Sequence, residues 1–355
     1  MSPPGPHRKR AMGHKDKKVD LDRERGIAPG LVAKTKKRLV VASGRSHRAL
    51  AAEVATALGT ELVPTEYRTF ASGEILTRFE VSVRGCDVFL VQSFGPPVNE
   101  WHMELLIMLD AAKRASAKRI TVVAPYYPYS RQDKKGRGRE PISARLVADL
   151  LKTAGADRVM SVDLHAAQIQ GFFDGPVDHL FAKPVLLDYF KRTLSEEDRE
   201  KLTVVSPDTG RVRVADQWSD SLDAPLAIIH KRRDPNVANQ VTVNEIVGRV
   251  RGRVCLLVDD MIDTGGTILK AAEALKANGA ERVIVAATHP VFSDPAVERL
   301  QNEVIDQVVV TDTIPLPEDR IFPTLTILPI APLLARAIHE VFVDGSVTSM
   351  FNGEA

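Results

Sequence analysis

Short apolar segments rich in β-branched residues alternate with amphipathic segments along most of this chain. The amphipathic segments at 47–59, 140–155 and 267–279 carry apolar residues at helical spacing. We expect strands at 38–43, 87–93, 119–127, 158–165, 203–208, 226–231, 253–260, 282–289, 307–313 and 325–330. Alternating strands and helices predict parallel sheets, and nearly unbroken apolar runs suit strands buried on both faces. The sequence therefore predicts an α/β fold with mainly parallel sheets flanked by helices.

One unit of this pattern occurs twice. The segments "AGADRVMSVDLH" and "NGAERVIVAATH" both contain a helix end, a Gly-Ala-x-Arg-Val sequence, a strand and a histidine. Glycine at a helix C-terminus before a strand is common in α/β proteins, but the long separation of Gly155 and Gly279 is consistent with two similar domains. We expect domains at 37–182 and 183–340, and whether the segment from about 341 to 355 returns to the first domain is left open.

The start of the chain has a different composition. Residues 1–38 contain 12 Lys and Arg against 4 Asp and Glu, whereas the net charge of the whole chain is only +2. This segment is also poor in aromatic residues, which is typical of disorder. We predict a disordered basic extension at 1–36. Contact of this extension with nucleic acid is an alternative that the composition favours less than simple solvation.

Cys86 and Cys255 are the only cysteines, and their separation fits no metal-binding motif. No run of 18 apolar residues occurs, and the first residues lack the apolar segment of a signal peptide. We therefore expect a reduced cytoplasmic protein with no membrane partner.

Several predicted strands end in charged or hydroxyl-bearing residues, as in "SGRS", "VDLHA", "SPDTG", "HKRR" and "ATHP". In open α/β sheets, ligands bind outside the carboxyl ends of the strands. A single Asp at such a position is often only a helix cap, but this many polar groups at equivalent ends indicate a charged ligand. A lone histidine such as His289 is better interpreted as structural.

The stretch "LLVDDMIDTGGT" at 256–267 indicates which ligand this is. Two glycines permit a sharp turn and close approach to the backbone, and the amides at the start of the following helix are suited to phosphate. The two adjacent acids are placed to accept hydrogen bonds from sugar hydroxyls. The combination predicts a phosphorylated ribose, bound by Asp259, Asp260, Asp263, Thr264, Gly265, Gly266 and Thr267.

This stretch resembles the signature of proteins that bind phosphoribosyl diphosphate, including the type I phosphoribosyltransferases. Two further segments, "SRQDKKGRGREPISA" and "DLHAAQIQGFFDG", resemble ribose-phosphate pyrophosphokinases, and the resemblance extends over about residues 38–353. It implies two similar phosphoribosyltransferase-type domains. No GxxxxGK[ST] loop occurs, so ATP must be held differently than in P-loop enzymes.

The resemblance implies transfer of the diphosphoryl group of Mg-ATP to the C1 hydroxyl of ribose 5-phosphate, for nucleotide, histidine and tryptophan biosynthesis. By the same resemblance, ATP would contact Phe70, Ser72, Glu74, Arg131, Gln132 and Asp133. His165 and Asp208 match the Mg²⁺ positions, and Lys231 and Arg233 match the cations of a mobile catalytic loop.

The usual class of this family is a homohexamer that is activated by inorganic phosphate and inhibited by ADP. The positions that match its allosteric anion site are Ser82, Arg84, Lys135, Arg137, Arg139, Ser346 and Thr348. Four features depart from the family pattern: Ser72 in the adenine loop, Gly138 between two arginines, Arg211 after "SPDTG", and a short loop at 230–240.

Two other functions are compatible with parts of the sequence. A type I phosphoribosyltransferase would share the stretch at 256–267, but the "SRQDKK" and "DLHAAQIQGFFD" segments are foreign to that group. A non-catalytic regulatory homologue of the synthase is the other alternative. Such relatives carry insertions in the mobile loops that are not seen here, and His165, Asp208, Lys231 and Arg233 are all present.

Overall fold

The computed structural model describes residues 37–232 and 243–351. The predicted extension at 1–36 and most of the short loop at 230–240 lie outside the described residues. The strands are β1 (Leu39–Ser43), β2 (Thr65–Thr69), β3 (Ile75–Phe79), β4 (Asp87–Val91), β5 (Arg119–Ala124), β6 (Arg158–Val162), β7 (Val177–Leu180), β8 (Leu202–Ser206), β9 (Leu226–Arg232), β10 (Val243–Val247), β11 (Val254–Ile262), β12 (Arg282–Pro290), β13 (Gln307–Thr311) and β14 (Leu325–Leu328). The helices are α2 (Arg48–Ala57), α3 (Val98–Arg114), α4 (Ser143–Ala154), α5 (Lys183–Thr193), α6 (Glu196–Glu200), α7 (Val212–Leu222), α8 (Gly266–Ala277), α9 (Ala296–Leu300) and α10 (Ala331–Phe342).

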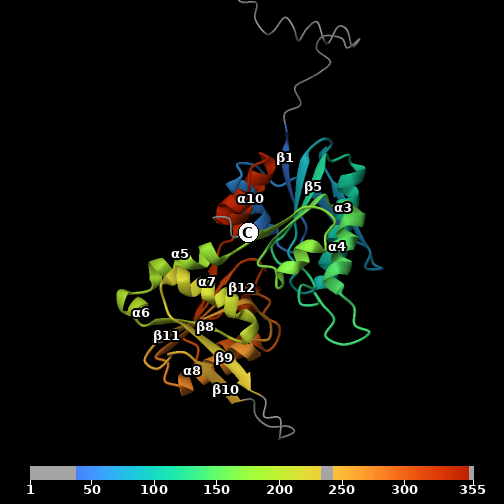
Figure 1. Ribbon diagram of the computed structural model, residues 1–355. Helices are drawn as coiled ribbons and strands as arrows, with labels where there is room; N and C mark the ends of the chain where they lie inside the picture. The colour runs from blue at the N-terminus through green and yellow to red at the C-terminus, as the bar shows by residue number, and fades with distance from the viewer. Residues whose placement is uncertain (1–36, 233–242, 352–355) are drawn as a thin grey trace, which may run out of the picture. The chain divides into compact units, whose positions relative to one another are not determined.

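The strands between residues 39 and 180 form a parallel sheet in the order β1-β4-β5-β6-β7, and β2 and β3 form a separate antiparallel hairpin. Helices α3 and α4 lie on one face of this sheet (Figure 1). Helix α2 covers the other face together with α10, which comes from near the end of the chain. The first sheet is therefore completed by a helix distant in sequence.

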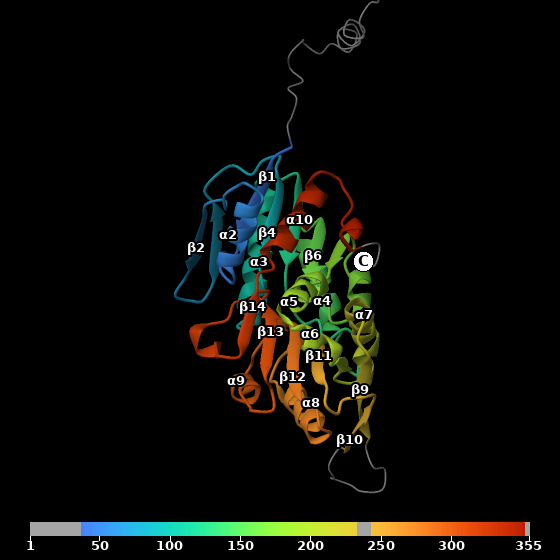
Figure 2. The same ribbon diagram turned by 90° about the vertical axis from the view of Figure 1, so that its left-hand side faces the viewer.

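The second sheet has the order β10-β9-β8-β11-β12-β13-β14. Its strands run parallel except for β10, which pairs antiparallel with β9. Helices α8 and α9 lie on one face (Figure 2), and α5 and α7 lie on the other. Each sheet is thus the middle layer of three.

Alternate residues of a strand explain this layering, because successive side chains point to opposite faces. In β4, Val88 and Leu90 pack toward α3 and α4, while Phe89 and Val91 pack toward α2. In β11, Leu257 packs toward α8 and Leu256 toward α7. All five residues of β4 are buried, as expected for a strand covered on both faces.

The predicted fold class is confirmed, since mostly parallel sheets flanked by helices make up the described part of the chain. Each expected strand is present, and β2, β3, β7 and β10 are additional strands that were not predicted. The helix expected within the amphipathic segment 140–155 spans Ser143–Ala154. The domain boundary at 182/183 stays a prediction, although the first sheet ends at Leu180 and the second starts at Leu202. Among the described helices, none combines the length and the apolar character that a bilayer crossing requires.

Candidate active site

The stretch "LLVDDMIDTGGT" forms the end of β11, a tight turn and the start of α8. Strand β11 continues to Ile262 because it pairs with β12 as far as Pro290. Gly265 then adopts a left-handed conformation with φ of 70°, which favours glycine, and α8 begins at the next residue. The turn therefore places the amides at the positive end of α8 next to the carboxyl end of a central parallel strand.

A cavity of about 360 Å³ lies at this turn. It brings together segments that are far apart in sequence, including all seven residues predicted to bind ribose phosphate. Its lining residues are Arg131, His165, Asp208, Arg211, Asp259, Asp260, Met261, Ile262, Asp263, Thr264, Gly265, Gly266, Thr267 and Ile268. The cavity therefore combines helix amides and threonine hydroxyls, which suit an anion, with several carboxylates.

Asp259 and Asp260 are largely buried and share one arginine as their counter-ion. Nη2 of Arg211 lies 2.6 Å from Oδ1 of Asp260, and its Nε lies 3.4 Å from Oδ1 of Asp259. Nδ1 of His165 lies 2.8 Å from Oδ2 of Asp260. The acidic pair of β11 is thus held by groups from two other segments, the residues before α7 and the segment after β6.

The two acids titrate differently because their neighbours differ. Burial, together with the charge of Asp260 beside it, raises the pKa of Asp259 well above its ordinary value. Burial also acts to raise the pKa of Asp260, but the hydrogen bond with His165 and the charge of Arg211 outweigh it, so this pKa is lowered. Asp260 is therefore the more strongly anionic of the pair.

A second ion pair lies across the same cavity. Nη1 of Arg131 lies 2.5 Å from Oδ2 of Asp263. Burial opposes ionisation of Asp263, but hydrogen bonds from Ser293 and Arg131 outweigh it and lower the pKa of the carboxyl. Arg131 comes from the segment between β5 and α4, so this contact links the predicted ATP segment to the predicted ribose-phosphate turn.

His165 and Asp208 both line the cavity. Nδ1 of His165 lies beside the carboxylate of Asp260, and an imidazole with a carboxylate partner is usual for a metal-binding histidine. Oδ1 of Asp208 accepts a hydrogen bond from the amide of Gly210 at 2.8 Å. Among residues 37–232 and 243–351, no three or more His, Cys, Asp or Glu side chains are arranged so that they could hold a metal ion by themselves. The donors present fit Mg²⁺ only if phosphate and water oxygens supply most of its ligands, which is common for this ion.

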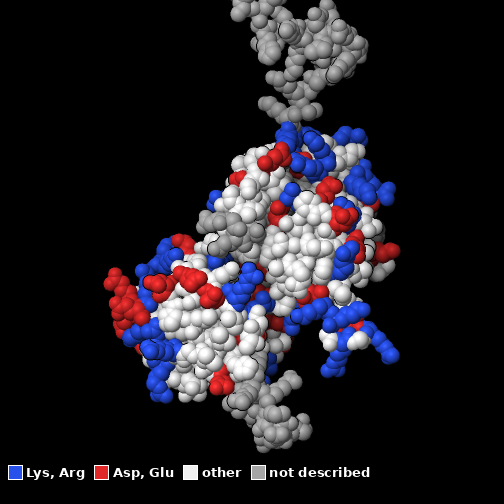
Figure 3. All heavy atoms as spheres, viewed as in Figure 1, with Lys and Arg blue, Asp and Glu red and all other residues white. Residues whose placement is uncertain are grey.

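The other predicted ATP residues do not line this cavity. Gln132 accepts a hydrogen bond from the hydroxyl of Ser143 at 2.6 Å, and buried Asp133 accepts one from the side-chain amide of Gln168. These two residues hold the loop that carries Arg131. Lys and Arg side chains gather on the exposed part of this loop, before α4 (Figure 3).

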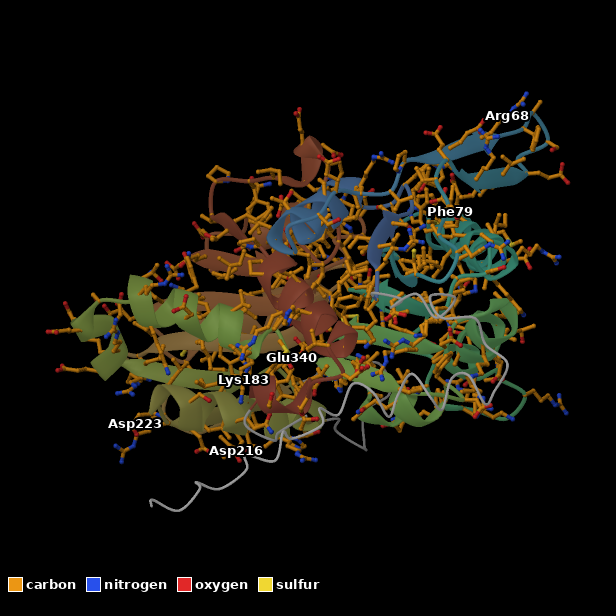
Figure 4. The ribbon with its side chains drawn as sticks, turned by 90° about the horizontal axis from the view of Figure 1, so that it is seen from above. Arg68, Phe79, Lys183, Asp216, Asp223 and Glu340 are labelled. Carbon is orange, nitrogen blue, oxygen red and sulfur yellow. The ribbon has the colours of Figure 1, made fainter. Side chains whose placement is uncertain are left out.

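Phe70, Ser72 and Glu74 form the turn of the β2–β3 hairpin. The amide of Phe70 donates to the carbonyl of Glu74 at 2.8 Å, and the Ser72 hydroxyl donates to the Glu74 carboxylate at 2.9 Å. Phe70 and Glu74 line a different cavity, beside α3. Figure 4 shows Arg68 of this hairpin on the opposite side of the described structure from Asp216 and Asp223 of the α7 region. The structure therefore does not bring the predicted adenine-binding turn into the cavity of its own chain.

The predicted catalytic cations cannot be placed in the same way. The backbone of Lys231 pairs with Asn244 between β9 and β10, but its side chain and all of Arg233 lie outside what the structure describes. Their roles stay predictions.

The predicted allosteric residues come from three segments: 82–84, 135–139 and 346–348. None of them lines either of the two cavities above. The amide of Arg137 donates to Glu140 at 2.9 Å, and the amide of Ser349 donates to the Ser346 hydroxyl at 3.4 Å. These contacts are local, so the shared anion site stays a prediction.

Arg211 is not among the predicted site residues, and in the sequence it stands out only as a departure from the family pattern after "SPDTG". Its position three residues after Asp208 was a usable signal, because both residues follow the carboxyl end of β8. His289, in contrast, is structural as expected, since it is buried and contacts the carbonyl of Val162 at 3.0 Å and the hydroxyl of Thr313 at 2.9 Å.

Comparisons with known proteins agree with this geometry. Residues 39–155 match the model of the N-terminal domain of ribose phosphate pyrophosphokinase, and residues 234–352 match that of the phosphoribosyl synthetase-associated domain. A ribose-phosphate pyrophosphokinase of Streptomyces avermitilis is 62% identical over 91% of this chain and 99% of its own length. One of Mycobacterium tuberculosis is 57% identical over 90% of this chain and 98% of its own.

The crystal structure of phosphoribosylpyrophosphate synthetase from Mycobacterium smegmatis has a TM-score of 0.81 and 56% identity, and the match covers 87% of this chain and all of that one. With these identities over nearly the full length of the relatives, the chain belongs to the ribose-phosphate pyrophosphokinase family.

Proposed function

We propose that this chain transfers the diphosphoryl group of Mg-ATP to the C1 hydroxyl of ribose 5-phosphate, giving 5-phosphoribosyl 1-diphosphate and AMP. A bond forms between the C1 oxygen and the β-phosphorus, and the bond from the β-phosphorus to the oxygen shared with the α-phosphate breaks. The C1 hydroxyl loses its proton, and AMP leaves. The product would supply nucleotide, histidine and tryptophan biosynthesis.

One observation carries the proposal: the cavity presents helix amides and a carboxylate pair to the same ligand, in a chain of this family. The amides of 264–267 and the hydroxyls of Thr264 and Thr267 suit the 5-phosphate. Asp259 and Asp260 suit the ring hydroxyls, since a carboxylate accepts hydrogen bonds from a diol. The amides and threonine hydroxyls thus suit the phosphate end of ribose 5-phosphate, and the two acids suit its ring hydroxyls.

Arg131 lies across the cavity from the turn and is suited to the phosphates of ATP, because a guanidinium can bind phosphate oxygens in pairs. Lys231 and Arg233 would add positive charge where negative charge develops on the transferred group. His165 and Asp208 would hold Mg²⁺ that is already bound to the phosphates. When bound, this ion neutralises charge on the phosphate oxygens.

Regulation and assembly belong to the same proposal. We expect a cytoplasmic homohexamer that requires inorganic phosphate and is inhibited by ADP at the anion-binding residues named above. The Gly138 and Ser72 positions are where this chain would differ from relatives in its response to ADP and in its adenine contact.

The test is an assay of AMP release from ATP and ribose 5-phosphate, with no nucleobase present, at several concentrations of phosphate and ADP. Lys231→Ala should reduce turnover by about two orders of magnitude or more, because a cation at the transferring phosphates stabilises the transition state. Binding of ribose 5-phosphate, measured by calorimetry, should be unchanged. Absence of AMP release by the unaltered protein would contradict the proposed function, and near-normal turnover of the variant would contradict the role of Lys231.

A further inference from the structure

Arg299, on the short helix α9, contacts the turn that precedes α8. Helix α9 packs beside α8 (Figure 2). Nη1 of Arg299 donates a hydrogen bond to the carbonyl of Thr264 at 2.8 Å, although Arg299 does not line the cavity. A Cβ added at Gly266 would lie 3.2 Å from the same nitrogen. The guanidinium therefore lies against the turn on a side that does not face the cavity.

Other residues that follow β12 support the same turn. Ser293 is hydrogen-bonded to the carboxylate of Asp263. A Cβ added at Gly265 would lie 3.5 Å from Cα of Ala296, so the two backbones pack closely. The segment after β12 thus forms a support behind the turn, and Arg299 supplies its hydrogen bond to a backbone carbonyl.

The charge of Arg299 is not neutralised by a carboxylate. In the described ranges 37–232 and 243–351, no Asp or Glu forms an ion pair with this half-buried side chain. The arginines that line the cavity differ, since Arg131 pairs with Asp263 and Arg211 pairs with Asp260. The positive charge behind the turn therefore adds to the attraction of the turn for an anion.

The carbonyl of Thr264 and the amide of Gly265 belong to one peptide group, so holding one orients the other. In a trans peptide, the carbonyl oxygen and the N–H point to opposite sides. Because Arg299 holds the oxygen behind the turn, the N–H of Gly265 is directed toward the cavity that this glycine lines. Among the described residues, this amide donates to no protein acceptor. A bound anion can therefore accept its hydrogen bond.

Glycine at position 265 would also permit the opposite orientation of this peptide. A half-turn of the peptide group changes the φ of Gly265 from 70° to about −110°, and glycine populates both signs of φ with similar ease. The rotated peptide would direct the carbonyl oxygen of Thr264 at the phosphate, and the partial negative charge of that oxygen repels an anion. The hydrogen bond from Arg299 therefore favours the orientation that binds phosphate.

We propose that Arg299 is a positioning residue for ribose 5-phosphate, because its hydrogen bond to Thr264 keeps the N–H of Gly265 directed at the 5-phosphate. The inference rests on the proposed function for the identity of the ligand. Loss of the arginine should weaken binding of the sugar phosphate and should not affect binding of ATP.

The experiment is a calorimetric titration of the full-length protein with ribose 5-phosphate in the absence of ATP. Arg299→Met should raise the Kd about tenfold or more, because a hydrogen bond to a charged phosphate oxygen is lost. Arg299→Lys should restore part of the affinity, since an ammonium group can still donate to the carbonyl of Thr264. In the assay of AMP release, Arg299→Met should raise the KM for ribose 5-phosphate and leave the KM for ATP unchanged.

Arg253→Met is the matched control. Nη2 of Arg253 also donates to a backbone carbonyl, that of Leu202 at 2.6 Å, but it does so at the start of β11, whereas the cavity lies at the end of this strand. Its replacement removes the same charge and a similar hydrogen bond, and it should leave the Kd for ribose 5-phosphate unchanged.

A double variant separates the orientation of the peptide from the effect of charge. Gly265→Ala also favours the rotated peptide, because alanine is disfavoured at positive φ. If both residues act on this one peptide, Arg299→Met combined with Gly265→Ala should raise the Kd by clearly less than the product of the two single effects. An increase equal to that product would overturn the proposal.

The remaining outcomes distinguish this proposal from the proposed function. Circular dichroism checks that each variant is folded, and Arg299→Gln replaces the methionine variant if that one is not. Absence of ribose 5-phosphate binding by the unaltered protein would contradict the proposed function, and with it the ligand named here. Normal binding by both the unaltered protein and the neutral variant would overturn only the role of Arg299.

Discussion

Gly265 and Gly59 adopt nearly the same backbone conformation in different surroundings. Their φ angles are 70° and 68°, so both lie in the left-handed region that favours glycine. A Cβ at Gly265 would meet only ordinary contacts, the nearest at 3.5 Å from Ala296, and one at Gly59 would meet none within 4 Å. Replacement of either glycine by alanine therefore tests the backbone conformation with little steric interference.

We predict that Gly265→Ala and Gly59→Ala each lower the free energy of unfolding by about 1 kcal/mol, measured by urea denaturation, because alanine is disfavoured in this region. Only Gly265→Ala should also raise the KM for ribose 5-phosphate, since a shift of its backbone moves the amides at the start of α8. An unchanged KM in Gly265→Ala, or an equal rise in the Gly59 control, would contradict the role of this turn in binding phosphate.

Asp312 connects three elements at the end of β13. Its carboxylate accepts a hydrogen bond from the amide of Ile330 at 2.7 Å, just before α10, and its carbonyl contacts Nε2 of His47 at 2.8 Å, at the start of α2. The titratable groups facing it are His47 and Glu53, both from the α2 segment. Burial, and to a smaller extent the charge of Glu53, raises the pKa of Asp312 to about 6.

This raised pKa predicts a pH-dependent difference between the unaltered protein and Asp312→Asn. The Asp312 carboxyl binds its proton more tightly in the folded protein than in the unfolded chain. Its contribution to stability is therefore present below about pH 4 and is lost as the pH rises through 6. The free energy of unfolding of the unaltered protein minus that of Asp312→Asn should therefore fall by roughly 1 to 3 kcal/mol between pH 4 and pH 7. His47 and Glu53 are common to both proteins, so their titration largely cancels. A difference that does not change with pH, in urea denaturation at matched pH values, would rule out Asp312 as the source.

The β2–β3 hairpin lies away from the cavity that contains Asp259 and Asp260 in its own chain. Phe70 is 38% exposed and lines a cavity beside α3, not the one that contains Asp259 and Asp260. If Phe70 contacts adenine, as the family resemblance implies, the hairpin must reach the cavity of a second copy.

Mixing two variants tests this arrangement. Phe70→Ala should raise the KM for ATP, and Lys231→Ala should abolish most turnover. In mixed oligomers of the two, a cavity with an intact Lys231 can receive an intact Phe70 from its neighbour. We therefore expect part of the activity at the normal KM for ATP to return on mixing with subunit exchange. No recovery, with exchange confirmed by native mass spectrometry, would show that Phe70 does not serve a neighbouring copy.

Most of the fold could be predicted because its strands are buried on both faces and read as unbroken apolar runs. Strand β2 was missed because its residues, "TEYRT", are mostly exposed and polar. Strand β3, "ILTRF", was missed because it is short and only its central residue is buried. Strand β7 is only four residues long, and β10 is an antiparallel edge strand without a full apolar run. Short or exposed strands are stabilised mainly by pairing with a neighbouring strand, and the local sequence does not show which strand that is.

The sequence by itself determined the alternation of strands and helices, the glycine turn before α8, and the closeness of two acids to helix amides suited to phosphate, because these depend on neighbours within a few residues. Only the tertiary structure decided that Arg211 lies between Asp259, Asp260 and His165, and that Arg131 meets Asp263. These contacts join residues 46 to 132 positions apart. Arg211 meets Asp259 and Asp260 because β8 and β11 are neighbouring parallel strands that end at the same edge of one sheet. Arg131 and His165 follow strands of the other sheet, so their contacts depend on how the folded chain packs.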